Sequence, residues 1–149
     1  MSQLEQYTGA AGKKRLEKAL KSHEMIGKNA AMARDFAKYA AVEEFADGAT
    51  LLKQDAKDND LYMIVDGEVA VEVNGNRVAT TGAGAPVGEL AILDPKGGRS
   101  ATVVAIKDTV VARISRPKFL SLAKKYPAVW SAIARHLARH VRRHNARFK

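Results

Sequence analysis

Residues 61–82, LYMIVDGEVAVEVNGNRVATTG, constrain the fold most, because apolar and polar residues alternate there and tight turns interrupt them. Val69, Val71 and Val73 fall on one face of such a pattern, with glutamates on the other. Asn-Gly at 74–75 favours a two-residue hairpin. Similar short apolar runs follow as far as residue 114, so the pattern predicts an antiparallel sandwich or barrel.

Helical patterns flank this region on both sides. Asn29, Ser115 and Pro117 are residue types that begin helices at their positions. The apolar spacing predicts helices over 11–26 and 29–41, a short helix over 118–125 and a long one from Pro127 toward Lys149. We therefore expect one α+β domain over residues 1–149: N-terminal helices at 11–41, a jelly-roll-like antiparallel β-roll at 44–116 and C-terminal helices at 117–149.

Composition excludes several classes of protein. The chain has no cysteine, which rules out disulfides, thiolate metal sites and a thiol nucleophile. No segment has the character of a signal peptide, and no apolar run approaches the roughly 18 residues that a membrane helix needs. A cytoplasmic location is therefore expected.

The net charge of +9 is unevenly distributed. Residues 1–108 hold 14 Lys and Arg against 16 Asp and Glu, whereas residues 109–149 hold 11 Lys and Arg and no acid. A basic tail of this kind is typical of a segment with an acidic neighbour, such as nucleic acid or a membrane surface, and equally of a solvated helix face. No helix-turn-helix pattern accompanies it, which disfavours nucleic-acid binding.

The segment VGELAILDPKGGRSATV, at 87–103, breaks the strand pattern in a way that suits a phosphodiester ligand. Gly88 allows close approach of backbone to a ligand, and a short helix after it would direct its first amides at an anion. Arg99 matches phosphate oxygens, and Ser100 adds a hydroxyl. Glu89 would repel a phosphate unless it accepts hydrogen bonds from a neighbouring sugar hydroxyl. A ribose beside a singly charged phosphate satisfies both residues.

GELAIL and RSATV together resemble the phosphate-binding cassette of the cyclic nucleotide-binding domains, and residues 45–71 are similar to the strands that precede it in that family. The resemblance covers roughly residues 25–145 and implies binding of a 3′,5′-cyclic mononucleotide with no other cofactor. It implies that Glu89 takes the ribose 2′-hydroxyl, that the amides of Gly88, Leu90 and Ala91 line the sugar-phosphate, that Arg99 pairs with the phosphate and that Ser100 bonds the phosphate or base.

Two positions depart from the family pattern. Asp55 stands where the family commonly has glycine, although Asp tolerates a left-handed backbone better than most residues. The loop before the arginine reads Pro-Lys-Gly-Gly, at 95–98, in place of a proline directly before it. The phosphate and ribose that the cassette contacts are common to all cyclic nucleotides, so the cassette does not identify the base. The residues expected to form a base pocket or lid are Val71, Val73, Trp130 and Arg135.

The last helix carries two further patterns. His136, His140 and His144 recur every four residues, which we interpret as a solvated basic face, because three such side chains on one helix rarely converge on a metal. The β-segments contain no histidine, and no enzyme is expected in this chain. The second pattern is an apolar stripe at helical spacing. We interpret it either as core packed against the roll or as a lid over the base. Its residues are Trp130, Ile133, Ala134, Leu137 and Val141.

Two functions of different class follow. The first is a sensor that binds a cyclic mononucleotide and relays binding through its C-terminal helices to a downstream effector. A narrower resemblance, to the sensor domains of bacterial Pycsar antiphage effectors, implies cyclic UMP or cyclic CMP as ligand and a C-terminal TIR-like NAD-cleaving domain. Its alternative is a cyclic AMP or cyclic GMP sensor of a kinase, channel or transcription regulator. The second function is a basic interaction module for nucleic acid or an anionic surface. The apolar stripe is compatible with a homodimer.

Overall fold

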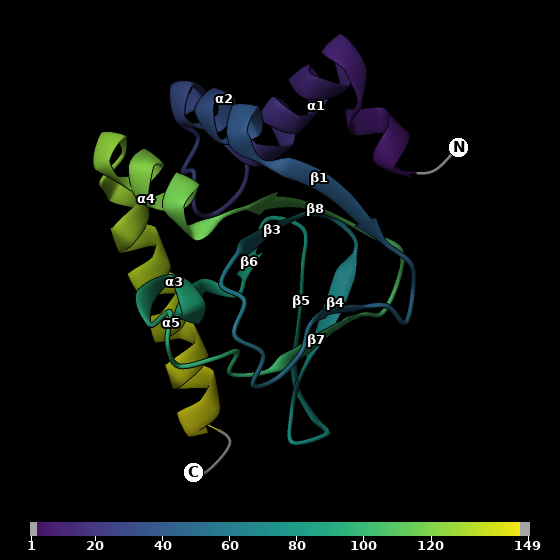
Figure 1. The fold of residues 1–149 in the computed structure, drawn as a ribbon, viewed down its shortest axis with the longest axis vertical. Coiled ribbons are helices and arrows are strands. Elements are labelled where there is room, and N and C mark those ends of the chain that lie inside the picture. Colours follow the sequence, from purple (N-terminus) through teal and green to yellow (C-terminus); the bar gives the residue numbers. More distant parts are fainter. Residues whose placement is uncertain (1–2, 147–149) are drawn as a thin grey trace.

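The computed structural model describes residues 3–146, with side chains as far as residue 143 (Figure 1). The chain begins with a 3₁₀ helix (η1, Gln3–Tyr7) and the helices α1 (Gly9–Lys21) and α2 (Ala30–Tyr39). The strands are β1 (Ala41–Phe45), β2 (Thr50–Leu52), β3 (Leu61–Asp66), β4 (Glu68–Val73), β5 (Asn76–Gly82), β6 (Pro86–Val87), β7 (Thr102–Ala105) and β8 (Thr109–Ile114). The helix α3 (Glu89–Leu93) lies between β6 and β7, and α4 (Arg116–Lys125) and α5 (Ala128–Ala146) follow β8.

The strands form two antiparallel sheets, which confirms the expected α+β fold. One sheet has the order β1-β8-β3-β6 and the other β2-β7-β4-β5. The helices α1 and α2 cover one end of this roll, while α5 runs along its side with α3 beside it (Figure 1). The β-roll begins at Ala41, three residues before the predicted boundary, because α2 already ends at Tyr39.

The strand β3 holds the two cores of the molecule together. Its run of apolar residues is buried on both faces, as is typical of a strand covered on each side. Leu61 and Met63 belong to the cluster formed with the helices, whereas Tyr62 and Ile64 belong to the cluster inside the roll. The alternation follows from the two-residue period of a strand. Helices and roll are therefore packed against opposite faces of one sheet.

The predicted hairpin at Asn74-Gly75 is confirmed. Both residues have positive φ, 52° and 82°, as a tight turn matched to strand twist requires. Val73 pairs with Asn76 across it. The turn at Asp66-Gly67 has a different role: Gly67, with φ of 106°, lies where the chain passes from β3 in one sheet to β4 in the other.

The first helix is shorter than its pattern predicted. α1 ends at Lys21, whereas the apolar spacing continued to residue 26. The prediction was wrong because Met25 and Ile26 are buried by a series of turns, which are closed by left-handed Gly27 and Lys28. The spacing of these buried residues in the sequence is that of a helix. Met25 and Ile26 nevertheless pack into the same core from turns and not from a helix.

The C-terminal helices begin where the sequence indicated, but the packed face of α5 matches the predicted stripe only in part. Ser115 caps α4 by accepting a hydrogen bond from the Lys118 amide (3.4 Å). Ala134 and Val141 are exposed, the latter by 58%, whereas Trp130 is 37% exposed but still packs on Phe119. Ile133 of the predicted stripe is buried and Leu137 packs against the core, but the other buried residues of α5 lie one position before predicted members, at Val129, Ala132 and His136. The apolar pattern predicted only part of this face, because a histidine occupies one of its buried positions.

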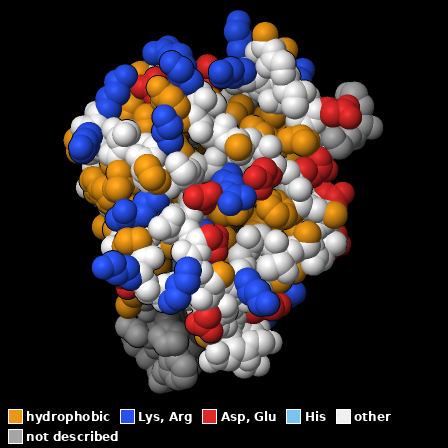
Figure 2. Space-filling model, viewed as in Figure 1, with side chains coloured by type: hydrophobic (Ala, Val, Ile, Leu, Met, Phe, Trp, Pro, Cys, Tyr) orange, Lys and Arg blue, Asp and Glu red, His pale blue; other side chains and the backbone are white. Residues whose placement is uncertain are grey.

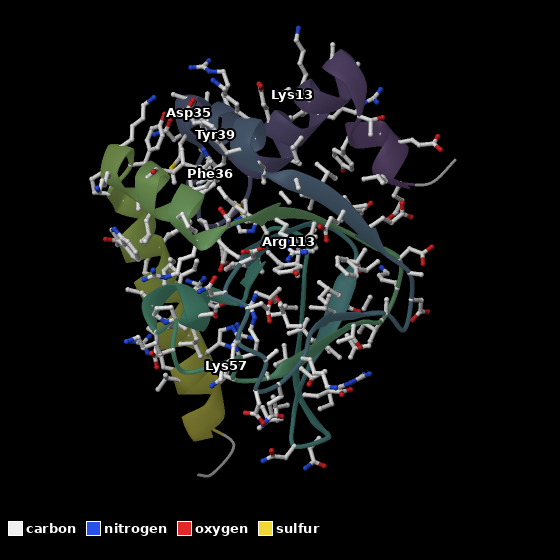
Figure 3. All side chains as sticks on the ribbon, in the orientation of Figure 1. Lys13, Asp35, Phe36, Tyr39, Lys57 and Arg113 are labelled. Atoms are coloured by element: carbon white, nitrogen blue, oxygen red, sulfur yellow. The ribbon has the colours of Figure 1, made fainter. Side chains whose placement is uncertain are left out.

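Charge is also segregated in the folded chain. On the face shown in Figure 2, Lys and Arg side chains are numerous over the helices, whereas Asp and Glu gather over the β-roll. Near the centre of the same view, Arg113 (labelled in Figure 3) pairs with Asp60 at 2.7 Å and with Glu43 at 3.3 Å. Within residues 3–146, no helix is both long and apolar enough to cross a membrane.

Replacement of Phe119 should test the helical core. Its ring is fully buried and packs edge-on against Phe36 and Trp130, with centroid distances of 6.2 and 5.6 Å. We expect Phe119→Ala to lower the free energy of unfolding by about 3–5 kcal/mol, because it removes these contacts and leaves a cavity. Urea denaturation measures the loss. Leu93→Ala, at a side chain that is 47% exposed, is the control and should cost far less; equal losses would contradict the packing described.

Candidate functional site

A cavity of about 150 Å³ opens between the roll, α3 and α5. Seven of the ten residues predicted to bind ligand or form a base pocket line it: Val71, Gly88, Glu89, Leu90, Ala91, Arg99 and Ser100. Three are placed elsewhere. Val73 lies at the hairpin end of β4, Trp130 packs on Phe119, and Arg135 lines a separate cleft with Tyr126 and Glu24. The wall that α5 contributes consists instead of His136, Leu137 and His140.

Gly88 shapes the wall of the cavity by its backbone. Its φ of 86° lies in the left-handed region, directly before the predicted short helix, which α3 confirms. A Cβ at this position would lie 2.7 Å from Nη1 of Arg99 and 3.1 Å from the carbonyl oxygen of Asp60. Glycine therefore meets two demands here, an unusual backbone angle and close approach of a buried charge. The family resemblance assigns the Ala91 amide to the sugar-phosphate. In the structure this amide donates to the Gly88 carbonyl (3.3 Å).

Arg99 is buried in the cavity wall and is held by protein acceptors. Nη2 and Nε donate to one carboxylate oxygen of Asp58, at 2.7 and 3.2 Å. Nη2 also donates to the Asp60 carbonyl (2.8 Å), and Nη1 donates to the Gly88 carbonyl (3.3 Å). The hydrogen bonds from Arg99 hold the pKa of Asp58 below its usual value. One of the five guanidinium N–H groups, on Nη1, is not used by these four bonds.

The loop before β3 fixes the backbone of Arg99 as well. The Asp55 amide donates to the Arg99 carbonyl, and the Arg99 amide donates to the Ala56 carbonyl, both at 2.8 Å. Asp55 has a φ of 72°, so it takes the left-handed conformation for which the family commonly uses glycine. Lys57 on this loop lies low in the view of Figure 3, near the level of the end of α5. Asp58 was not among the predicted site residues. The one feature of the sequence that marks it is the segment Asp-Asn-Asp, at 58–60, before β3.

Glu89 is buried and contacts α5 directly. Its Oε1 lies 3.4 Å from Nε2 of His136, and Nδ1 of the same imidazole contacts Oε1 of Glu24. Arg139 donates to the other oxygen of Glu24 at 3.0 Å. Burial lowers the pKa of His136, but the carboxylates of Glu89 and Glu24 raise it by more, so the net pKa lies above the usual 6.5. His136 is therefore a bridge between two carboxylates.

The prediction of a solvated histidine face was wrong for the first of its members. His136 is only 4% exposed, and its charge is balanced by the two carboxylates. His140 is partly buried, with its ring 4.4 Å from that of His136, and its pKa is lowered mainly by burial. The side chain of His144 lies outside the described residues. Among those described, no group of three or more His, Cys, Asp or Glu side chains could hold a metal ion.

The family is established by comparison with known proteins. The cyclic nucleotide-binding domain family matches residues 42–126, more than half of the chain, so the chain belongs to this family. The family is a sensor fold rather than an enzyme fold, in agreement with the expectation from sequence.

The chain is also similar to particular proteins of known identity. The chain is 37% identical over 134 residues to the Pycsar effector protein PaPycTIR of Pseudomonas aeruginosa, and 34% identical to BcPycTIR of Burkholderia cepacia. Each alignment covers 90% of this chain but 44% of the relative, so the chain spans less than half their length. Among solved structures, the cAMP-bound PfPKA-R fragment superposes with a TM-score of 0.79 at 20% identity, over 90% of this chain and 46% of that one, which confirms the fold.

Two glycine substitutions distinguish the cost of backbone strain from the cost of a steric clash with Arg99. Gly88 and Gly75 both have positive φ, but a Cβ at Gly75 would meet nothing within 4 Å. We expect Gly75→Ala to lower the free energy of unfolding by about 1–2 kcal/mol, the cost of a left-handed alanine. Gly88→Ala should cost more, because its methyl group also displaces Arg99. Chemical denaturation compares the two; equal costs would contradict the role given to Gly88.

Proposed function

We propose that this chain binds a 3′,5′-cyclic mononucleotide in the cavity and relays binding through α5. The observation that carries the proposal is that one small, otherwise largely apolar cavity is lined by two buried side chains of opposite charge, Glu89 and Arg99. A carboxylate accepts hydrogen bonds from sugar hydroxyls, and a guanidinium pairs with phosphate oxygens. A ligand that presents a hydroxyl beside a single phosphate charge satisfies both.

The cyclic phosphate would be held by Arg99 and the hydroxyl or amide of Ser100. Because Asp58 already pairs with Arg99, the phosphate shares the guanidinium with that carboxylate, whose side chain is 44% exposed and adjusts at low cost. The ribose hydroxyl would be accepted by Glu89. The base would then lie toward Val71 of the roll and the wall contributed by α5.

The downstream part of the mechanism rests on the relatives. Because this chain spans 44% of the Pycsar effectors that it matches, we propose that it is the sensor of a longer protein with a TIR-like effector domain. That resemblance favours cyclic UMP or cyclic CMP as the ligand. A role in antiphage defence, a cytoplasmic location and a homodimeric assembly belong to the same proposal.

Substitution of Arg99 tests the phosphate site. In calorimetric titrations with cyclic UMP, CMP, AMP and GMP, we expect Arg99→Ala to weaken the preferred nucleotide by about 30-fold or more, since a buried phosphate charge loses its partner. Arg113→Ala is the matched control: it removes an arginine that also contacts Asp60 and Tyr62 but does not line the cavity. Circular dichroism establishes that both variants fold.

The outcomes separate the candidate functions. A pyrimidine preference supports the Pycsar-like sensor, and a purine preference supports a cyclic AMP or cyclic GMP sensor. Undiminished binding by folded Arg99→Ala would overturn the site. If none of the four nucleotides binds, while DNA, RNA or anionic lipid binds in a salt-sensitive manner, the chain is instead a basic interaction module.

A further inference from the structure

The cavity continues into a groove between β5 and α5. The groove has a volume of about 790 Å³, and three residues line both spaces: Leu90, Leu137 and His140. The rest of its lining comes from residues 78–80 of β5 and from Val141 and Arg143 of α5. The cavity alone, at about 150 Å³, is smaller than the roughly 300–1,000 Å³ of most ligand sites. A nucleotide that binds in the cavity therefore needs the space of the groove as well.

The helix α5 carries polar side chains from the ribose end of the proposed site to the groove. Nε2 of His136 lies 3.4 Å from Oε1 of Glu89, the proposed acceptor of the ribose hydroxyl. His140 follows one turn later, about 6 Å along the helix axis, and the centroids of the two imidazole rings are 4.4 Å apart. Arg143 comes three residues after His140 and lines the groove with it. Since the base is attached to the ribose, we expect it at the level of His140 and Arg143.

His140 has a buried polar atom that the fold leaves without a hydrogen bond. Its Nε2 is buried and has no hydrogen-bond partner within the part of the chain that the structure describes. Most buried polar atoms are paired, because an unpaired one costs free energy. Burial and the charge of His136 lower the pKa of His140, so its imidazole is largely neutral at neutral pH. A neutral imidazole nitrogen either donates or accepts one hydrogen bond, so Nε2 is able to pair with the edge of a base.

The charge of the groove favours one kind of base edge. Arg143 carries a positive charge at all working pH values, and none of the described residues that line the groove is acidic. A guanidinium donates hydrogen bonds and accepts none, whereas the Thr80 hydroxyl and the His140 imidazole are able to donate or accept. A carbonyl oxygen on the base is therefore complementary to all three groups. An exocyclic amino group, which donates, would instead face the positive charge of Arg143.

We propose that the groove selects cyclic nucleotides whose base has a carbonyl oxygen at its outer edge, and that His140 and Arg143 donate the hydrogen bonds that recognise this oxygen. Uracil and guanine have such an oxygen, whereas cytosine and adenine have an amino group in its place. This inference rests on the proposed function, because it assumes that the phosphate reaches Arg99 and the ribose reaches Glu89. It narrows the two pyrimidine candidates to cyclic UMP, and among the purines it favours cyclic GMP over cyclic AMP.

Paired nucleotides isolate this edge of the base. Cyclic UMP and cyclic CMP share their phosphate, ribose and ring size, and they differ where uracil has a carbonyl oxygen and cytosine an amino group. In calorimetric titrations of the intact chain, we expect cyclic UMP to bind about tenfold more tightly than cyclic CMP, because the amino group leaves a buried donor unpaired. Cyclic GMP should exceed cyclic AMP for the same reason.

Variants of α5 assign the preference to particular side chains. His140→Leu removes the imidazole nitrogens and should bind cyclic UMP and cyclic CMP with nearly equal affinity. Arg143→Gln removes the positive charge of the groove and should lose part of the preference. Arg142→Gln is the matched control, because it removes the same charge from an adjacent exposed position that does not line the groove, and it should keep the preference. Circular dichroism establishes that the three variants fold.

The outcomes distinguish this inference from the proposed function. A preference for the amino base in whichever pair binds, or a His140→Leu variant that keeps the wild-type preference, would overturn the inference while the binding site stands. Equal losses in Arg143→Gln and Arg142→Gln would contradict the contact given to Arg143, since the overall charge of α5 then accounts for the effect. If the wild type binds none of the four nucleotides, the proposed function fails first, and this inference fails with it.

Discussion

A guanidinium buried in the wall of a small cavity is the constraint on which the site depends. The charge of Arg99 is tolerated there because Asp58 neutralises it and two backbone carbonyls accept its remaining hydrogen bonds. Those partners come from the loop before β3 and from the turn before α3, so one side chain organises both segments. Gly88 is required at the same point, because any larger residue would meet Arg99. The contacts that hold Arg99 in the proposed anion site are therefore part of the folded chain itself.

The sheet β1-β8-β3-β6 connects the cavity to the helices. One face contributes to the roll that contains the cavity, and the other face packs against α1, α2 and α4. The helix α5 meets the cavity directly through His136 and Leu137. Asp35 of α2, seen with Tyr39 at the helical end in Figure 3, accepts hydrogen bonds from Lys125 (2.8 Å) and Tyr126 (2.5 Å) at the junction before α5. The start of α5 is therefore fixed to the helices, while its middle rests on the site.

Much of this architecture could be predicted from local signals. Alternating valines and Asn74-Gly75 specify the hairpin, and Gly88, Glu89 and Arg99 identified the wall of the cavity. The failures involve long-range partners. Nothing local pairs Asp58 with a residue 41 positions away, or His136 with Glu24. The stripe on α5 was predicted only in part. Ile133 and Leu137 pack against the core, but His136 occupies a buried position that an apolar pattern cannot contain, because its burial depends on carboxylates supplied by the fold.

In the proposed function, Glu89 accepts the ribose hydroxyl within the cavity. The most direct measurement compares the affinities of wild type and Glu89→Gln for the preferred cyclic nucleotide and for its 2′-deoxy analogue. We expect the wild type to bind the ribonucleotide more tightly than the deoxy form, and the variant to lose most of this difference. A wild type that binds both forms equally would contradict it.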